Sequence, residues 1–423
     1  MNAFTCLFAA ALTAGLGMQL WLAARQAAHI RSHADRVPPS FADRITLEDH
    51  QKAARYSLAR LGAQRWDLLV GTLVLLAWTL GGGLNRLDAW IAGWSLGPLW
   101  AGAALVIGTV WISALIDLPL SVWRTFGIEA RFGFNRTTPG GFVRDRLLAA
   151  ALTLILGVPL VLAVLWLMAQ AGNLWWLWAW LLWMGFTLFV TWAYPVLIAP
   201  LFNRFEPLKD GHLRERLEAL LTRCGFRSNG MFVMDGSRRS AHGNAYFTGF
   251  GANKRIVFFD TLLEGLDANE VEAVLAHELG HFKRHHITKG LLLSAVMALG
   301  GLALLGWLAG QAWFFSGLGV DGEGHALALV LFMLTLPTFT LFISPLMSRL
   351  SRHHEFEADS FAAEQTNPRH LISGLVKMYR DNASTLTPDP LYSAFYHSHP
   401  PAPVRIAHLS SKIPAQGPGP LME

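Results

Sequence analysis

The segment LLAAALTLILGVPLVLAVLWLM, residues 147–168, is almost entirely apolar and carries no charged side chain. An α-helix needs about 20 such residues to cross the hydrocarbon core of a bilayer. Pro159 lies inside the segment, and membrane helices tolerate an internal proline better than helices in water do. The segment therefore predicts a transmembrane helix, and this decides the fold class of the chain.

Six further segments are apolar and long enough to span a membrane, or nearly so, at residues 3–24, 68–84, 97–116, 174–194, 290–309 and 326–346. No Lys or Arg precedes the first of them, so we expect a membrane helix there rather than a cleaved signal peptide. The segment at 68–84 is short and ends at three consecutive glycines. The sequence thus predicts an α-helical polytopic membrane protein with seven transmembrane helices.

The composition of the whole chain agrees with this fold class. Of its 423 residues 53% are hydrophobic and 15% are charged, whereas soluble domains carry about 25% charged residues. This excludes a disordered, fibrous or nucleic-acid-coating protein, and we expect no nucleic acid among its partners. Two cysteines are too few for a disulfide framework. The net charge of +5 indicates basic loops beside anionic membrane lipid.

Lys and Arg are distributed unevenly between the loops. Segment 25–67 contains eight of them and loop 117–146 contains five, whereas loops 169–173 and 310–325 contain none. Basic residues accumulate on the cytoplasmic side of a membrane. The N-terminus is therefore expected outside, and the polar segments 195–289 and 347–423 are expected in the cytoplasm.

Segment 195–289 has the pattern of a small α/β unit. It predicts an amphipathic helix ended by Gly225 and three short strands, at 211–224, 231–234, 245–251 and 254–260, with a turn at 251–253 between the last two strands. Asp267 and Glu270 form a capping-box pattern that predicts the start of a helix over 271–286. The tail from Ser410 is rich in Pro and Gly and is expected to be disordered.

The predicted helix carries His277-Glu278-Leu279-Gly280-His281. Residues four apart share one face of a helix, so both imidazoles can reach a single metal ion with Glu278 beside it. His285 continues the same stripe, and we expect it at the surface or supporting a ligand. A hydrolytic zinc site uses three protein ligands and leaves one position for water. The third ligand must therefore come from elsewhere in the chain.

A second cluster follows the last apolar segment, in SRLSRHHEFEAD at residues 348–359. Glu355 and Asp359 are again four apart on a predicted helix. One of them can bind the metal while the other accepts a hydrogen bond from a ligand imidazole and fixes its tautomer. Glu357 points to a different face and is the weaker candidate. Glu278 would then take the proton from the attacking water and pass it to the leaving amine.

A third cluster, YHSHPPAPVR at residues 396–405, offers His399 and Arg405 as donors to a developing oxyanion. Taken alone, this segment is more typical of a surface loop. Its position after the other two clusters, however, makes it part of a larger pattern of three clusters.

These clusters, in this order on a chain with seven spans, resemble the type I CAAX prenyl endopeptidases, integral-membrane zinc metalloproteases that cleave isoprenylated proteins. The resemblance extends over nearly the whole chain and includes FGFN at 132–135, PLFNRFEPL at 200–208, DGSRRSAHGNAYFTG at 235–249 and SHPP at 398–401. It implies seven helices around a water-filled chamber, with a small gluzincin-type α/β zinc peptidase domain.

The resemblance also implies a role for individual residues. Zinc would be bound by His277, His281 and Glu355. Glu278 would be the catalytic base, Asp359 a partner of the site that is sometimes described for the family as a proton donor, and His399 and Arg405 transition-state stabilisers. Asn244 and Ala245 resemble the edge strand that pairs with an extended substrate, which in this family is a peptide or protein and includes lipidated ones. His397 does not match the spacing of the additional histidine found in many members, so it receives no role.

The clusters and spans divide the chain into four regions: a five-span membrane region at 1–194, a cytoplasmic catalytic segment at 195–289, a transmembrane hairpin at 290–346 and a C-terminal catalytic segment at 347–423. Arg greatly outnumbers Lys and the loops are short. We therefore expect a bacterial inner-membrane protein.

Two other functions are compatible with parts of this pattern. A bacterial heat-shock membrane protease for quality control also carries HExxH and a later Glu, but it typically has fewer spans. A transporter or receptor could bind metal through its histidines without catalysis. Asp117, an ionisable residue at the edge of a span, is the best support for the transporter or receptor.

Overall fold

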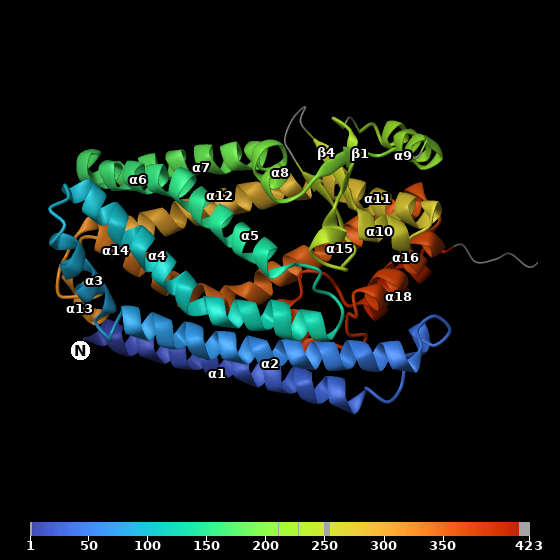
Figure 1. Cartoon of the computed structure of the whole chain (residues 1–423), viewed down its shortest axis with the longest axis horizontal. Coiled ribbons are helices and arrows are strands. Elements are labelled where there is room, and N and C mark those ends of the chain that lie inside the picture. Colours follow the sequence, from blue (N-terminus) through green and yellow to red (C-terminus); the bar gives the residue numbers. More distant parts are fainter. Residues whose placement is uncertain (1, 210, 227, 249–253, 414–423) are drawn as a thin grey trace, which may run out of the picture.

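The computed structural model describes residues 2–209, 211–226, 228–248 and 254–413. Long helices run along the length of the molecule, and one small sheet with short helices lies at one end, opposite the N-terminus (Figure 1). The sheet, α9–α11 and α16–α18 are called the sheet unit below.

The membrane region consists of long helices and a few short ones that connect or extend them: α1 (Ala3–Ser32), α2 (Leu47–Trp78), α3 (Gly83–Ala92), α4 (Pro98–Val122), α5 (Pro139–Leu152), α6 (Val158–Gln170), α7 (Trp175–Ala193), α8 (Ala199–Phe202), α12 (His286–Leu308), α13 (Ala312–Gly317) and α14 (His325–Thr340). Among the described residues, six helical stretches are long and apolar enough to cross a membrane, or seven if α2 and α3, bent by 53°, form one span. The predicted α-helical polytopic fold is confirmed.

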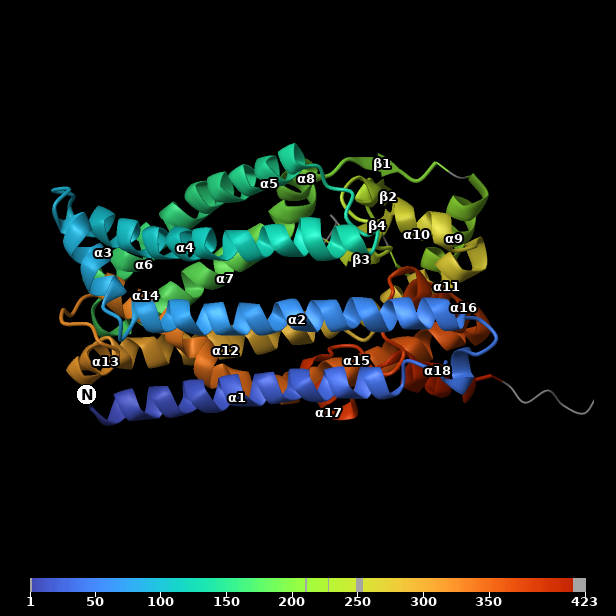
Figure 2. The same cartoon turned by 60° about the horizontal axis from the view of Figure 1, so that its bottom comes forward.

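Several helices extend beyond the apolar segments that predicted them. α2 begins at Leu47, where Thr46 accepts a hydrogen bond from the amide of Asp49, and ends shortly before the glycine run. Gly82 there has φ of +70°, a left-handed conformation that favours glycine and lets the chain turn into α3. α1 and α2 lie side by side in both views (Figures 1 and 2).

Three spans are interrupted by π-helical segments, at Trp123–Glu129, Thr153–Gly157 and Tyr194–Ile198. Pro159 lies two residues after the end of the second, and the third contains Pro195. Proline lacks an N–H and cannot complete the regular ladder, so a wider turn re-pairs the freed carbonyl groups. Apolar length alone does not predict such local changes of helical period.

The last predicted span continues directly into a catalytic cluster. After a short 3-10 turn at Leu341–Ile343, α15 (Ser344–Gln365) carries the chain from the membrane region into the sheet unit. Glu355 and Asp359 therefore lie on the same continuous helical rod as the span (Figure 2).

The sheet unit contains β1 (Phe205–Pro207), α9 (Gly211–Arg223), β2 (Met231–Met234), β3 (Ala245–Thr248), β4 (Arg255–Phe259), α10 (Asp260–Gly265), α11 (Ala268–Lys283), α16 (Pro368–Asp381), α17 (Pro390–Tyr396) and α18 (Ala402–Ser410). The strand order is β1-β2-β4-β3; β2 and β4 are parallel, and the other pairs are antiparallel. The predicted helix at 211–224 and strand at 231–234 are confirmed, whereas β1 and α10 were not predicted. The predicted turn at 251–253 and most of the Pro/Gly-rich tail lie outside the described residues.

Two large hydrophobic cores and two smaller clusters hold the described parts of the chain together. One large core lies among the membrane helices, with Phe8, Leu105 and Leu331 among its fully buried members. The other large core joins the sheet to α9, α11, α15, α16 and α18, through residues such as Phe258 and Leu275. α11 is thus buried in the sheet unit with its histidine face toward α15, and this arrangement positions the site.

Candidate metal centre

α11 is fixed at its start by the predicted capping box. The Asp267 side chain accepts hydrogen bonds from the amides of Asn269 and Glu270, and the Glu270 carboxylate accepts one from the amide of Asp267 at 2.9 Å. These bonds satisfy amides that the helix itself leaves unpaired. The register of the histidines on α11 is therefore set from its N-terminus.

The end of α11 differs from the prediction. The helix stops at Lys283, and α12 begins at His286. Between them His285 adopts φ of +58° and is exposed. The expectation of one helix over 271–286 is therefore wrong, because the left-handed residue redirects the chain. His285 leaves the histidine stripe, and His286 turns inward instead.

A close contact between α11 and α15 brings the first two clusters together. A Cβ added to Gly280 would lie 2.8 Å from Cα and 3.0 Å from the carbonyl oxygen of Ala358. Real Cβ atoms do not approach backbone so closely, because interiors are packed to van der Waals contact. Glycine at this position of the HELGH motif thus permits the approach that places Glu355 beside His277 and His281.

The metal-facing atoms of these three residues converge. The Nε2 atoms of His277 and His281 are 3.3 Å apart, and the Glu355 carboxylate lies 3.5 Å and 3.3 Å from them. Glu355 is 3% exposed, and its Oε2 accepts no hydrogen bond within the described structure. Two imidazole nitrogens and a buried carboxylate facing one point fit a divalent metal ion.

Asp359 contacts the opposite nitrogen of His277. Its Oδ1 lies 2.9 Å from His277 Nδ1, and it receives two hydrogen bonds from the Arg405 guanidinium, at 2.9 Å and 2.5 Å. The geometry thus separates the two carboxylates that the sequence left open: Glu355 lies on the Nε2 side of the ring, where the ligand atoms converge, and Asp359 lies on its Nδ1 side.

The surroundings of His277 favour its protonated form when no metal is bound. Burial and the Arg405 cation disfavour the charged ring, but contacts with Asp359 and Glu355 outweigh both and raise its pKa to about 9. A proton on Nε2 can thus take the place of a cation between the converging groups. Metal must compete with that proton.

His399 and Arg405 lie at different depths. Arg405 is buried behind the carboxylates, with Nη1 3.6 Å from Glu355. The His399 side chain is 64% exposed, and its Nδ1 is 2.8 Å from Glu355 Oε2, although the angle does not make a hydrogen bond. This placement suits His399 for contact with a substrate and Arg405 for holding Asp359. Their roles in the transition state stay predictions.

The other predicted residues lie around this group. Glu278 is half-buried on α11 next to the first histidine. Asn244 is exposed and precedes Ala245, the first residue of the edge strand β3. Gly243, one residue earlier, is held by the Asn382 side chain, which accepts from its amide at 3.0 Å and donates to its carbonyl at 3.3 Å. Sequence reasoning did not find Asn382, because 139 residues separate the partners.

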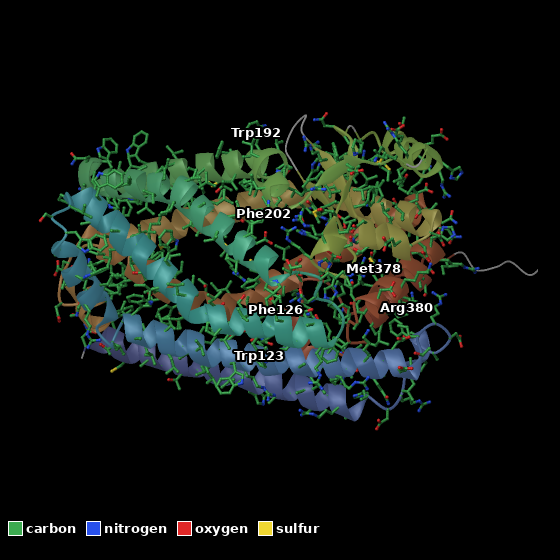
Figure 3. All side chains as sticks on the ribbon, in the orientation of Figure 1. Trp123, Phe126, Trp192, Phe202, Met378 and Arg380 are labelled. Atoms are coloured by element: carbon green, nitrogen blue, oxygen red, sulfur yellow. The ribbon has the colours of Figure 1, made fainter. Side chains whose placement is uncertain are left out.

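A cavity of about 740 Å³ opens beside His399, between the membrane helices and the sheet unit. Its lining includes Tyr56, Arg60, Glu129 and Asn382 together with His399. Figure 3 shows Trp123 and Phe126, on the π-helical segment after α4, and Met378 and Arg380, on α16, in the part of the molecule where the two regions meet. His399, whose Nδ1 lies 2.8 Å from Glu355, thus connects the three converging residues to a space lined by both parts of the chain.

Comparison with known proteins covers the same two parts. Residues 26–204 match the family model for the CAAX prenyl protease N-terminal region with five membrane helices, and residues 207–413 match that of peptidase family M48. The chain is 38% identical to the CAAX prenyl protease 1 homolog of Arabidopsis thaliana over 73% of each protein. It is 31% identical to the CAAX prenyl protease 1 homolog of Homo sapiens, over 96% of this chain and 95% of that protein. The crystal structure of S. mikatae Ste24p matches with a TM-score of 0.90 and 28% identity, covering 97% of this chain and 99% of that one.

Proposed function

Because the chain belongs to peptidase family M48 and is similar to CAAX prenyl proteases over almost its full length, we propose that it is a zinc enzyme acting on the C-terminal region of lipidated proteins. It is a multi-pass integral-membrane metalloendopeptidase that hydrolyses peptide bonds. The metal, the residue roles, the lipid on the substrate and the orientation in the membrane are the proposed parts.

The convergence of His277, His281 and Glu355 is the observation that carries the choice of zinc and of its ligands. Two imidazoles and one carboxylate with an open position are a donor set typical of hydrolytic zinc. Harder cations such as Mg²⁺ prefer oxygen ligands only. Bound zinc would supply Lewis acidity to the scissile carbonyl and a water of lowered pKa.

The side chains around His277, His281 and Glu355 have separate proposed roles in the reaction. Glu278 accepts the proton from the attacking water and returns it to the leaving amine. Asp359 accepts from Nδ1 of His277 and so keeps the lone pair of Nε2 on the metal side. Arg405 anchors Asp359 through two hydrogen bonds. His399, at the cavity, is placed to donate to the developing oxyanion.

The substrate proposal rests on the relatives' names and on the shape of the site. Asn244 and Ala245 begin an edge strand, and an edge strand can pair with an extended peptide through main-chain hydrogen bonds. The cavity beside His399 offers the Arg60 cation and the Tyr392 and Tyr396 rings, whereas Arg124 there is paired with Asp67 and Asp117. Such a lining suits a short peptide with a free carboxylate next to an apolar group.

We also propose the division into a membrane region at 1–194, a catalytic segment at 195–289, a membrane hairpin at 290–346 and a catalytic segment at 347–423. Both catalytic segments contribute to one hydrophobic core, which supports treating them as one unit. The positive-inside distribution supports a cytoplasmic location for this unit, with membrane lipid around the apolar helices and a bacterial inner membrane as the setting.

The two alternatives have less support. The match to the five-helix N-terminal model argues against a quality-control protease with fewer spans. Asp117, the residue that favoured a transporter or receptor, pairs with Arg124 at 3.1 Å. An ion pair at the end of a span accounts for its charge without a transport role.

Cleavage of matched peptides tests the proposal. The purified full chain is incubated with a C-terminal peptide bearing a farnesylated cysteine, and with the same peptide unmodified. We expect cleavage that is lost on chelation, restored by zinc and faster on the farnesylated peptide, with Glu278→Gln as the inactive control. Equal rates on the two peptides would contradict a lipidated substrate, and activity that persists in the chelator would contradict zinc.

A further inference from the structure

A third histidine contacts His281 on the Nδ1 side of its ring, away from the point where the candidate metal ligands converge. His286, the first residue of α12, is 6% exposed, and its Nδ1 lies 3.0 Å from Nδ1 of His281. Its other nitrogen, Nε2, lies 2.9 Å from the Glu357 carboxylate on α15. The three side chains form one hydrogen-bonded line, from His281 through His286 to Glu357, that leads away from the candidate metal centre.

The hydrogen-bonding rules of imidazole allow only one arrangement of protons along this chain of three side chains. Nε2 of His281 faces the metal side, so its lone pair is needed there and its proton must sit on Nδ1. His281 then donates to Nδ1 of His286, which can accept only if its own proton is on Nε2. That proton is in turn donated to Glu357. Every hydrogen bond in the line is satisfied in this one arrangement.

We propose that His286 and Glu357 are positioning residues that fix the ring orientation and tautomer of His281 for metal binding, an inference that rests on the proposed metal site. The arrangement parallels the other ligand histidine. There, Asp359 accepts from Nδ1 of His277, and here a neutral imidazole backed by a carboxylate takes that place. Partners that hold a ligand imidazole in this way typically change metal affinity or activity about 10–100-fold when they are removed.

The same side chains could instead form a second metal site, because ligand atoms of His286, His354 and Glu357 lie within 4.8 Å of one another. The ring geometry argues against this. His354 is stacked on His286, with centroids 4.0 Å apart and an interplanar angle of 12°. A metal lies close to the plane of each imidazole that binds it, about 2.0–2.1 Å from the nitrogen. Two nearly parallel stacked planes do not meet at such a distance.

Zinc affinity of the purified full chain, measured by competition with a chromophoric chelator, tests the proposal. His286→Leu removes the acceptor, and we expect affinity to fall about 10–100-fold. His286→Asn places an amide oxygen near the former Nδ1 position, so we expect it to recover most of that loss. Recovery by Asn would not follow if His286 merely filled space, because Leu fills the pocket better.

Variants of the neighbouring residues complete the design. Glu357→Gln still accepts from His286 and should bind zinc nearly as wild type, whereas Glu357→Ala should bind it more weakly. Glu357 is partly exposed, so its variants remain informative if His286→Leu does not fold. His354→Ala is the matched control, since it removes the stacked ring and leaves the line intact. It should bind zinc as wild type does.

Three results would overturn the proposal. They are wild-type affinity in both His286→Leu and Glu357→Ala, equal affinity in the Leu and Asn variants, and a second bound zinc that is lost in His354→Ala. The variant Glu355→Ala distinguishes failure of the positioning role from failure of the proposed metal site itself. If Glu355→Ala loses zinc while the His286 and Glu357 variants keep it, only the positioning role is wrong. If Glu355→Ala also keeps zinc, the proposed metal site is wrong.

Discussion

Glu278 lies directly after His277 in sequence but has a different task, because it contributes no atom to the group of converging ligand atoms. Replacing it with Gln keeps the shape and removes the base. We expect Glu278→Gln to bind close to one zinc per chain and to lose turnover by about 10²–10⁴-fold. Peptide hydrolysis by the purified variant measures this. Retention of more than about a tenth of wild-type turnover would show that Glu278 is not the base.

The raised pKa of His277 has a consequence for metal binding. Its value of about 9 in the metal-free chain lies above the usual 6.5, so a proton competes with zinc until the pH passes about 9. Zinc affinity should therefore rise by about tenfold per pH unit and level off near pH 9. In Asp359→Asn, where His277 loses its charged partner, the zinc affinity should level off at a lower pH. Chelator competition across pH 5.5–9.5 measures both, and the same plateau in both proteins would contradict this explanation.

At the scale of elements, the close crossing of α11 and α15 depends on Gly280. Ala at this position would force the helices apart, and overpacking of this kind costs about 1–3 kcal/mol. We expect Gly280→Ala to lower the unfolding temperature and to bind zinc more weakly. Gly290→Ala is the matched control, because that helical glycine has nothing within 4 Å of a Cβ. Equal stability and equal zinc binding in the two variants would show that the close contact at Gly280 is not needed for either property.

The elements also show where sequence patterns succeed and where they stop. Asp267 and Glu270 predicted the start of α11, because a capping box is local and depends on residues three apart. The end of the same helix was missed, since nothing in the periodicity signals that His285 takes a left-handed conformation. His285 was expected on the histidine stripe, at the surface or supporting a ligand, and it is exposed at the surface, whereas His286 was overlooked. Helix starts have a side-chain signature here, whereas this helix end has none.

At the scale of the molecule, the apolar segments predicted the fold because the cost of exposing backbone to lipid dominates every other preference. Six of the seven predicted spans overlap a helical stretch that is long and apolar enough to cross a membrane, whereas the span predicted at 68–84 runs over the bend between α2 and α3. The site needed more than apolar length: Arg405 and Asp359 are 46 residues apart, and Asn382 and Gly243 are 139 apart. Spacing on one helix selected Glu355 and Asp359 as a pair, but only their positions around His277 favour Glu355 as the proposed metal ligand and Asp359 as the proposed supporting carboxylate.

The orientation of the whole molecule is tested by labelling single cysteines, after replacement of Cys6 and Cys224. Arg214 and Ser410 are exposed on the sheet unit, and Asn173 is exposed in the loop between α6 and α7. With the sheet unit in the cytoplasm, cysteines at Arg214 and Ser410 should react with an impermeant maleimide only after permeabilisation. A cysteine at Asn173 should react in intact cells. The reverse pattern would show the opposite orientation.

The zinc content of purified Glu355→Ala, determined by elemental analysis beside Glu278→Gln, tests most directly the assignment of His277, His281 and Glu355 as the metal ligands. Removing a ligand leaves two imidazoles and additional water, so Glu355→Ala should contain little zinc after dialysis. Glu278→Gln, whose substitution leaves the ligands in place, should contain close to one zinc per chain. A Glu355→Ala protein that keeps a full zinc complement would contradict the metal centre on which the proposed activity depends.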